Sequence, residues 1–204
     1  MSAFTDSALR NNPVWAQLLG LCPLLAVSNS VVNALGLALA STLVLIGANG
    51  TIAVIRRQIP GFARLPCFVL VIASFTTIAM LLMQAYAFDL YLRIALFVQI
   101  IVTNCMILGR VEAFASRQNV GRALADAAGT AAGFALALMA LGVARELIAT
   151  GGLFDNMERL FGPPAAHWHL SLLDGGLVIA ALPPGAFIIA GLLIAAGQAF
   201  FRTT

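Results

Sequence analysis

The sequence predicts an all-α polytopic membrane protein with six transmembrane helices, and three observations support this fold class. Of its 204 residues, 61% are hydrophobic and only 9% are charged. The apolar residues form continuous runs of about 20, the length that a helix needs to cross a bilayer, without the alternation typical of a membrane β-barrel. The positive charges are all arginines, and most lie between the runs. We therefore treat residues 1–204 as a single integral membrane domain.

The first half of the chain contains three predicted spans. The first covers residues 13–31 and is interrupted near Pro23, because a proline inside a helix removes a backbone hydrogen bond. The second covers 34–55 and ends at two arginines, and the third begins at LPCF and covers 65–88. No small-residue cleavage site follows the first run, so we expect it to stay in the membrane rather than to be removed as a signal peptide.

The second half contains three further predicted spans. The fourth covers residues 91–112 and contains Cys105, the fifth covers 127–149 and is rich in Ala and Gly, and the sixth follows LPPG and covers 182–201. The long connection before the sixth span holds HWHLSLLDGG. Its Trp168 is expected at the level of the lipid headgroups, where Trp is enriched.

The arginines predict the orientation of the spans. Counted on alternate sides, one side carries Arg10, Arg56, Arg57, Arg64, Arg110, Arg117, Arg122 and Arg202, and the other carries Arg93, Arg145 and Arg159. Cytoplasmic loops carry the excess of positive charge, so we expect the larger group and both termini in the cytoplasm. A five-span alternative would place the C-terminus outside.

The six spans are expected to form two inverted three-helix repeats, residues 12–88 and 91–201, with interrupted helices 1 and 4. The third and sixth spans both open with Leu-Pro, and the first and fourth each carry a Gln followed five or six residues later by a cysteine. Because three spans is an odd number, the second repeat must be inverted relative to the first. Counted along their spans, Cys22 and Cys105 are both expected near the middle of a core roughly 30 Å thick.

The two central thiols suggest a cofactor site. A free cysteine in a bilayer is ordinarily a small, inert hydrophobic residue. Two at matching depth, one beside Pro23 and one beside Asn104, are instead compatible with a [2Fe–2S] cluster, which takes four thiolates. Cys67 is expected at the cytoplasmic mouth of the third span with a structural role, so a second chain would supply the two missing ligands.

Two other functional classes stay open. A secondary transporter can also be built on inverted repeats and broken helices, and a purely structural subunit would carry inert thiols. The acids nearest the spans are expected at span ends, where snorkelling or salt bridging suffices, which disfavours a self-contained ion relay. They are Asp89, Glu112, Asp126 and Glu146. The arginines do not form one face, so we expect no nucleic-acid partner.

Polar residues near the breaks are expected to satisfy free backbone groups or to donate hydrogen bonds to cluster sulfurs. They are Ser28, Asn29, Ser30, Asn33, Thr103 and Asn104. His167 and His169 are expected to anchor the outer loop at the interface rather than to bind a metal.

The segments QLLGLCPLLAVSNS, QAYAFDLY, IVTNCMILGR and LPPGAFI resemble the family of the E subunit of the Rnf complex, which includes related membrane subunits of sodium-pumping NADH:quinone oxidoreductase. The resemblance implies a pair of homologous six-helix subunits in opposite orientations, each giving two cysteines to one shared [2Fe–2S] cluster. The matching positions are Cys22 and Cys105. It also implies a complex in the bacterial inner membrane that moves electrons between ferredoxin and NAD, couples this to ion transport, and carries its flavins on other subunits.

Overall fold

The structure of the protein is a computed structural model that describes residues 14, 16–150, 152–153, 170–171 and 182–202. In chain order its elements are α2 (Leu21–Val27), α3 (Val31–Ile55), η2 (Gly61–Ala63), α4 (Arg64–Tyr86), α5 (Phe88–Ile100), η3 (Ile101–Thr103), α6 (Cys105–Arg110), the π-helix η4 (Val111–Ala115), α7 (Val120–Thr150), β1 (Gly152–Leu153), β2 (Leu170–Ser171) and α10 (Pro183–Arg202). Apart from turns and connections, the described residues are thus helical, with one short antiparallel strand pair, β1 with β2.

Four helical segments are long and apolar enough to cross a membrane: Val31–Ile55, Gly61–Tyr86, Tyr91–Ala115 and Val120–Ala149. They correspond to the second to fifth predicted spans, which are confirmed as helices. α10 lies where the sixth span is predicted, but the apolar part found in it is shorter, Pro183–Ala195. A crossing there, and with it the full six-helix count, stays a prediction.

The first predicted span is interrupted, as expected, but the break lies a few residues before Pro23. Among the described residues of this span that precede α3, only the seven of α2 are helical, and the chain before them turns at Leu18 and Gly20, whose φ angles are 55° and 77°. Pro23 is the third residue of α2. The first backbone N–H groups of a helix have no intrahelical acceptor, so a proline in this turn breaks nothing. The interruption therefore precedes Cys22 instead of following it.

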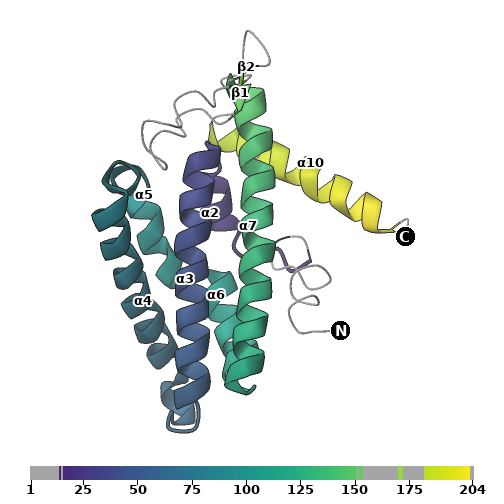
Figure 1. Cartoon of the computed structure of the whole chain (residues 1–204). Helices are drawn as coiled ribbons and strands as arrows, with labels where there is room; N and C mark the ends of the chain where they lie inside the picture. Colours follow the sequence, from purple (N-terminus) through teal and green to yellow (C-terminus); the bar gives the residue numbers. More distant parts are fainter. Residues whose placement is uncertain (1–13, 15, 151, 154–169, 172–181, 203–204) are drawn as a thin grey trace.

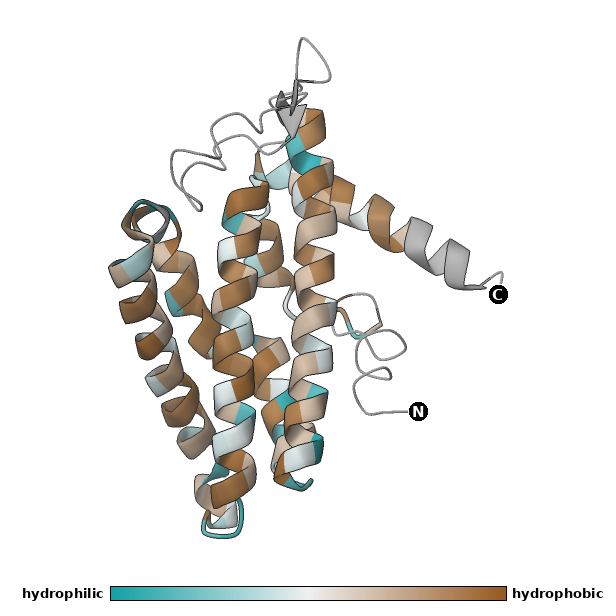
Figure 2. Ribbon diagram, viewed as in Figure 1, coloured by the Kyte–Doolittle hydropathy of each residue, from teal (hydrophilic) through white to brown (hydrophobic). Residues whose placement is uncertain are grey.

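α3 and α7 lie side by side and run in opposite directions along the centre of the molecule (Figure 1). Glycines allow their close approach at both ends. A Cβ built on Gly142 would lie 3.2 Å from the Cβ of Ala34, and one built on Gly50 would lie 3.2 Å from a methyl carbon of Leu124. α4 and α5 pack on α3, and α10 starts beside α2 and α7 and extends away from the bundle. Hydrophobic residues cover the length of the helices, and hydrophilic ones gather towards their ends (Figure 2).

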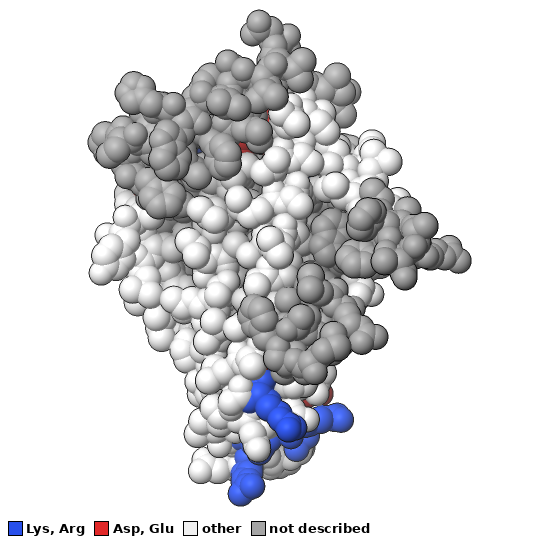
Figure 3. Space-filling model, turned by 45° about the vertical axis from the view of Figure 1, so that its right-hand side comes forward, with Lys and Arg blue, Asp and Glu red and all other residues white. Residues whose placement is uncertain are grey.

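The loops that follow α3 and precede α7 meet at one end of the bundle. Arg56 donates to the carbonyl of Gln118 and, at 2.9 Å, to Oδ1 of Asn119. Arginine side chains gather at this end and are absent from the rest of the described surface in this view (Figure 3). The arginine-bearing loops of the two halves therefore share one end, as the arginine count predicts. We refer to it as the basic end.

Gly47 gives a test of the packing between α3 and α4. A Cβ at this position would lie 2.5 Å from two ring carbons of Phe75, closer than packed atoms approach. We expect Gly47→Ala to destabilise the protein by about 1–3 kcal/mol, the usual cost of overpacking. Gly191→Ala is the matched control, because no atom of the described residues lies within 4 Å of its Cβ. Thermal unfolding in detergent should show a lower midpoint for the first variant only, and equal midpoints would mean that Phe75 moves without cost.

Candidate site at two interrupted helices

The two interruptions of the chain meet in space. Gly20 precedes α2 with a left-handed backbone, and Asn104 precedes α6 with an extended one. A Cβ built on Gly20 would lie 3.2 Å from the Cβ of Met106 and 3.4 Å from Oδ1 of Asn104. The chain entering the helix of Cys22 is thus in direct contact with the chain that flanks Cys105. Gly20 and Asn104 are far apart in the sequence, so this contact depends on the tertiary fold.

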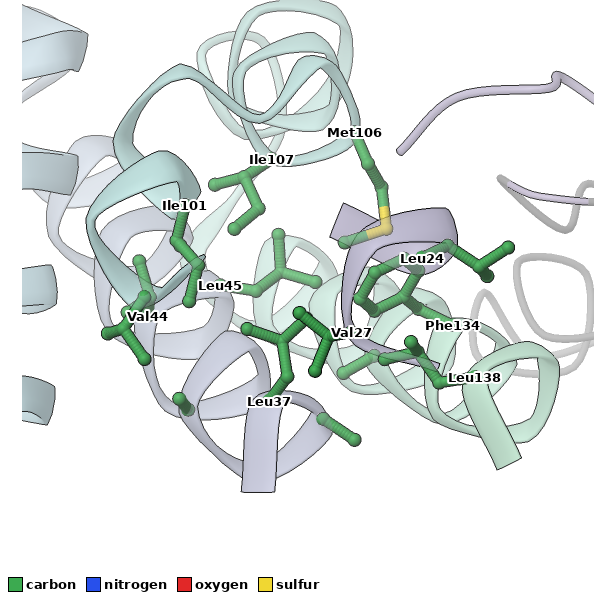
Figure 4. Packing of buried hydrophobic residues seen from close by; sticks show 14 of the residues in the cluster. Leu24, Val27, Leu37, Val44, Leu45, Ile101, Met106, Ile107, Phe134 and Leu138 are labelled. Atoms are coloured by element: carbon green, nitrogen blue, oxygen red, sulfur yellow. The ribbon is translucent and has the colours of Figure 1, made fainter. Parts of the chain in front are cut away.

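The meeting point lies halfway along α7. The same Cβ on Gly20 would lie 3.2 Å from Cε2 of Phe134, which is near the middle of this 31-residue helix. Figure 4 shows Phe134 beside Leu24, with the side chain of Met106 directed towards both. Since α7 contains a candidate membrane span, this position agrees with the mid-depth expected for both breaks.

Both cysteines face outwards from this packed region. Cys22 and Cys105 are free and exposed, whereas Pro23 and Leu24 on one helix and Met106 on the other are buried. The helical repeat explains the difference, because the inward neighbours fill the core and leave the thiols on the opposite side. In a bundle surrounded by lipid or by partner chains, exposed thiols are available to a second chain.

Two thiols are half the number of ligands that a four-thiolate cluster takes. Within the described part of the chain, no group of three or more His, Cys, Asp or Glu side chains could hold a metal ion. Cys67 lies in the first turn of α4, near the basic end, and is partly buried. His167 and His169 lie outside the described residues.

Among the polar residues expected near the breaks, Asn104 is placed to serve the site. Its Oδ1 accepts a hydrogen bond from the N–H of Met106 at 3.0 Å and caps α6. Asn104 is 3% exposed, and its Nδ2 has no hydrogen-bond partner among the described residues. A buried amide donor beside a ligand position is a group that can stabilise sulfur. Asn29 and Asn33 instead bond to each other, and Thr103 bonds to the carbonyl of Ile100.

Charged residues near the span ends are more buried than the sequence suggests. Arg110 and Arg145, which the arginine count treats as loop residues, lie within helices and are 8% and 2% exposed. Arg110 forms a salt bridge with Asp126, with 3.1 Å between Nε and Oδ2. Glu146 is 2% exposed. The expected salt bridging is confirmed for Asp126, and the buried Glu146 accepts a hydrogen bond from the N–H of Val31. The adjacent Arg145 and Glu146 lie inside the predicted fifth span, and this position in an apolar run could have indicated their burial.

Gly20 is expected to be sensitive to substitution. Gly20→Ala places a side chain at a left-handed φ, which costs about 1–2 kcal/mol, and brings its Cβ to 3.2 Å from both Met106 and Phe134. Gly109→Ala is the control, since among the described side chains its Cβ would meet only Leu19, at 3.8 Å. Thermal unfolding should show a loss for Gly20→Ala alone. Equal stability of both variants would contradict the close contact of the two breaks.

Comparison with known proteins gives consistent matches. A family model described as "Rnf-Nqr subunit, membrane protein" matches residues 1–194. The chain is 50% identical over 192 residues to the E subunit of the "Ion-translocating oxidoreductase complex" of Pseudomonas paraeruginosa, a match that covers 93% of this chain and 80% of that relative. Proteins of the same name from Cellvibrio japonicus and Haemophilus ducreyi are 50% and 49% identical, over 91% and 96% of this chain and 79% and 87% of the relatives. The region matched by the family model includes both exposed cysteines.

Proposed function

The chain belongs to the Rnf-Nqr family of membrane subunits, and from this premise we propose that Cys22 and Cys105 supply two of the four ligands of a [2Fe–2S] cluster shared with a partner subunit. The protein is a membrane subunit of an ion-translocating oxidoreductase complex. In this proposal its own task is to carry electrons across the middle of the bilayer. The remaining ligands come from a homologous six-helix subunit in the opposite orientation.

One observation carries the proposal: the segments that precede α2 and α6 are in contact halfway along a candidate membrane span, and each of these short helices has an exposed cysteine near its start. Cysteines that only fill space in a membrane protein have no reason to lie near matching interruptions of two helices. The antiparallel packing of α3 and α7 supports the inverted three-helix repeats, because these helices hold equivalent places in the two halves. A partner built on the same plan would present its own two thiols from the opposite side.

The residues of this chain have separate roles around the thiols. Cys22 and Cys105 bind, and the buried Nδ2 of Asn104 is a donor that lies next in sequence to a ligand. Leu24, Met106 and Phe134 are buried and pack together beside the helices that carry the thiols, which keeps water out of this part of the core. When bound, a [2Fe–2S] cluster supplies one-electron redox chemistry, with a potential set by hydrogen bonds to sulfur and by solvent access.

In this proposal the other subunits of the complex supply the remaining steps of electron transfer and ion transport. Electrons pass between ferredoxin and NAD through flavin and iron–sulfur centres on other subunits, and their transfer drives ion transport. This chain needs no substrate pocket for that task. It acts in the bacterial inner membrane as a relay between subunits on the two faces.

Iron and acid-labile sulfide in purified samples test the shared ligation. The chain co-purified with its homologous partner should contain about two iron and two sulfide per pair, as a [2Fe–2S] cluster requires. The chain purified alone should contain neither. A full complement of both in the isolated chain would show that a second subunit is not needed and would overturn the proposal.

The orientation has its own test. We expect the basic end to face the cytoplasm, together with both termini. Alkaline phosphatase fused after Pro60, in the loop at the basic end, should be inactive, and the same enzyme fused after Gly152, beyond α7, should be active. The reverse pattern would mean that the chain is inserted the other way round.

A further inference from the structure

Two adjacent charged residues lie inside the apolar wall of α7 and are not part of the site of the two thiols. Arg145 and Glu146 are each 2% exposed, and Arg145 is among the largest fully buried side chains. Burying a charge is costly unless it is paired and hydrogen-bonded. Arg145 and Glu146 should therefore have hydrogen-bond partners inside the protein.

Arg145 binds the end of α2. Its Nη1 donates to the carbonyl of Leu25 at 3.0 Å and to Oγ of Ser28 at 2.9 Å. Ser28 is the C-cap of α2 and is 0% exposed. The last carbonyls of a helix have no intrahelical donor and carry partial negative charge, so a guanidinium there supplies both a hydrogen bond and a favourable charge.

Glu146 binds the start of the next helix. Its Oε2 accepts a hydrogen bond at 2.6 Å from the N–H of Val31, the first residue of α3. The N-cap residue Ser30 makes no side-chain capping bond, so the carboxylate takes that place. A negative charge at a helix N-terminus is favourable for the same electrostatic reason. The two residues thus clamp the α2–α3 turn to α7, each with the charge that suits its helix end.

This clamp bears on Cys22 because α2 is short. A helix of seven residues is marginal without tertiary contacts, and its N-cap, Gly20, supplies no side-chain capping bond. Cys22 is the second residue of this helix, and Leu25 and Ser28 lie within its next two turns. The direction of α2, and with it the position of the Cys22 thiol, therefore depends on the contacts that hold the C-terminal end of α2.

We propose that Arg145 and Glu146 are positioning residues for Cys22: Arg145 holds the far end of its short helix against α7, Glu146 holds the start of α3 that follows it, and together they fix the direction of α2 and the place of the thiol. The consequence for a cluster rests on the function proposed above, but the placement of α2 does not. A general contribution to stability is the competing explanation, and it would affect all helices alike.

Hydrogen–deuterium exchange on the full chain, co-purified with its partner, separates the two explanations. Arg145→Gln removes the charge, Ser28→Ala removes a single acceptor and keeps the fold, and Arg145→Lys restores the charge. Arg122→Gln, an exposed arginine on the same helix, is the matched control. For Arg145→Gln we expect exchange in α2 to rise by about ten-fold or more, as the loss of a hydrogen bond to a charged group implies. Ser28→Ala should give a smaller rise, and Arg145→Lys should recover part of the protection.

The location of the change decides the outcome. Exchange in α4 and α5 should remain within about two-fold of the wild type, the range of a neutral substitution. Unchanged exchange of α2 in Arg145→Gln and Ser28→Ala, or an equal rise in every helix, would overturn the positioning role.

Electron paramagnetic resonance of the same samples tests whether the placement of α2 also affects the proposed cluster. A changed line shape or midpoint potential in Ser28→Ala, with wild-type spectra in Arg122→Gln, would extend the positioning to the cluster. Unchanged spectra, with faster exchange in α2, would mean that the clamp does not reach the cluster. Absence of any cluster signal in the wild type would instead overturn the proposed function, while the exchange result would still decide the placement of α2.

Discussion

Replacing Cys22 or Cys105 with alanine is expected to abolish electron transfer through the complex. Loss of a residue that only supports a metal ligand typically costs about 10–100-fold, so loss of a ligand should exceed about 100-fold. Each substitution removes one of the two thiols that this chain presents at the meeting point of its breaks. The measurement is ferredoxin-dependent reduction of NAD by the purified complex, with subunit content checked to show that assembly is intact.

Cys67→Ala is the matched control for both variants. It removes a thiol from the same chain, but Cys67 lies in the first turn of α4 near the basic end. Its activity should remain within about two-fold of the wild type, as for a substitution away from any special feature. Wild-type activity in Cys22→Ala, or equal losses in all three variants, would contradict the assignment of the ligands.

Asp126→Asn should cause a large loss of stability. It leaves the guanidinium of Arg110, which is 8% exposed, without the carboxylate of its salt bridge. Removal of one partner from a buried pair costs about 3–5 kcal/mol, because the other charge stays buried. Asp89→Asn is the control, since Asp89 is exposed in the first turn of α5. Thermal unfolding in detergent measures both.

The double replacement Arg110→Met with Asp126→Leu makes this test sharper. Replacing both partners of a buried pair with apolar residues is often neutral or stabilising. The double variant should therefore unfold at a temperature close to that of the wild type, well above Asp126→Asn. A loss below about 1 kcal/mol in Asp126→Asn would mean that the guanidinium reaches water, against the burial that the structure shows.

Much of the helical content could be predicted from the sequence because apolar runs of span length leave few alternatives. The second predicted span, 34–55, differs from α3 only by a few residues at its start. The fifth, 127–149, begins later than α7, which starts at Val120. Arg122 and Asp126 lower the hydropathy of that first stretch, but the salt bridge of Asp126 lets the helix continue through it.

The breaks are predictable only in part. The interruption beside Cys105 agrees with the structure, because Asn104 is a good capping residue within an apolar run and caps α6. For the first span the sequence predicts the interruption at Pro23, since proline is the usual signal. The actual turn uses Leu18 at positive φ, a conformation that costs energy in an isolated chain and depends on contacts with the rest of the fold. No local pattern indicates it.

The contacts that define the candidate site are likewise long-range. Gly20 reaches Met106 and Phe134, and Arg145 reaches Leu25, across more than 80 positions of the chain in each case. Their pairing is decided by how α2 and α6 pack on α7. From the sequence, the depth of each cysteine could be estimated along its own span. Their convergence could only be inferred from the inverted repeat.

Low-temperature electron paramagnetic resonance of the dithionite-reduced pair, this chain with its homologous partner, tests the central claim most directly. If Cys22 and Cys105 hold half of a shared cluster, the wild-type pair shows the signal of a reduced [2Fe–2S] centre, and the pair carrying Cys22→Ala shows none. An intact wild-type pair without this signal, or a Cys22→Ala pair that keeps it in full, would contradict the claim that these thiols bind the cluster.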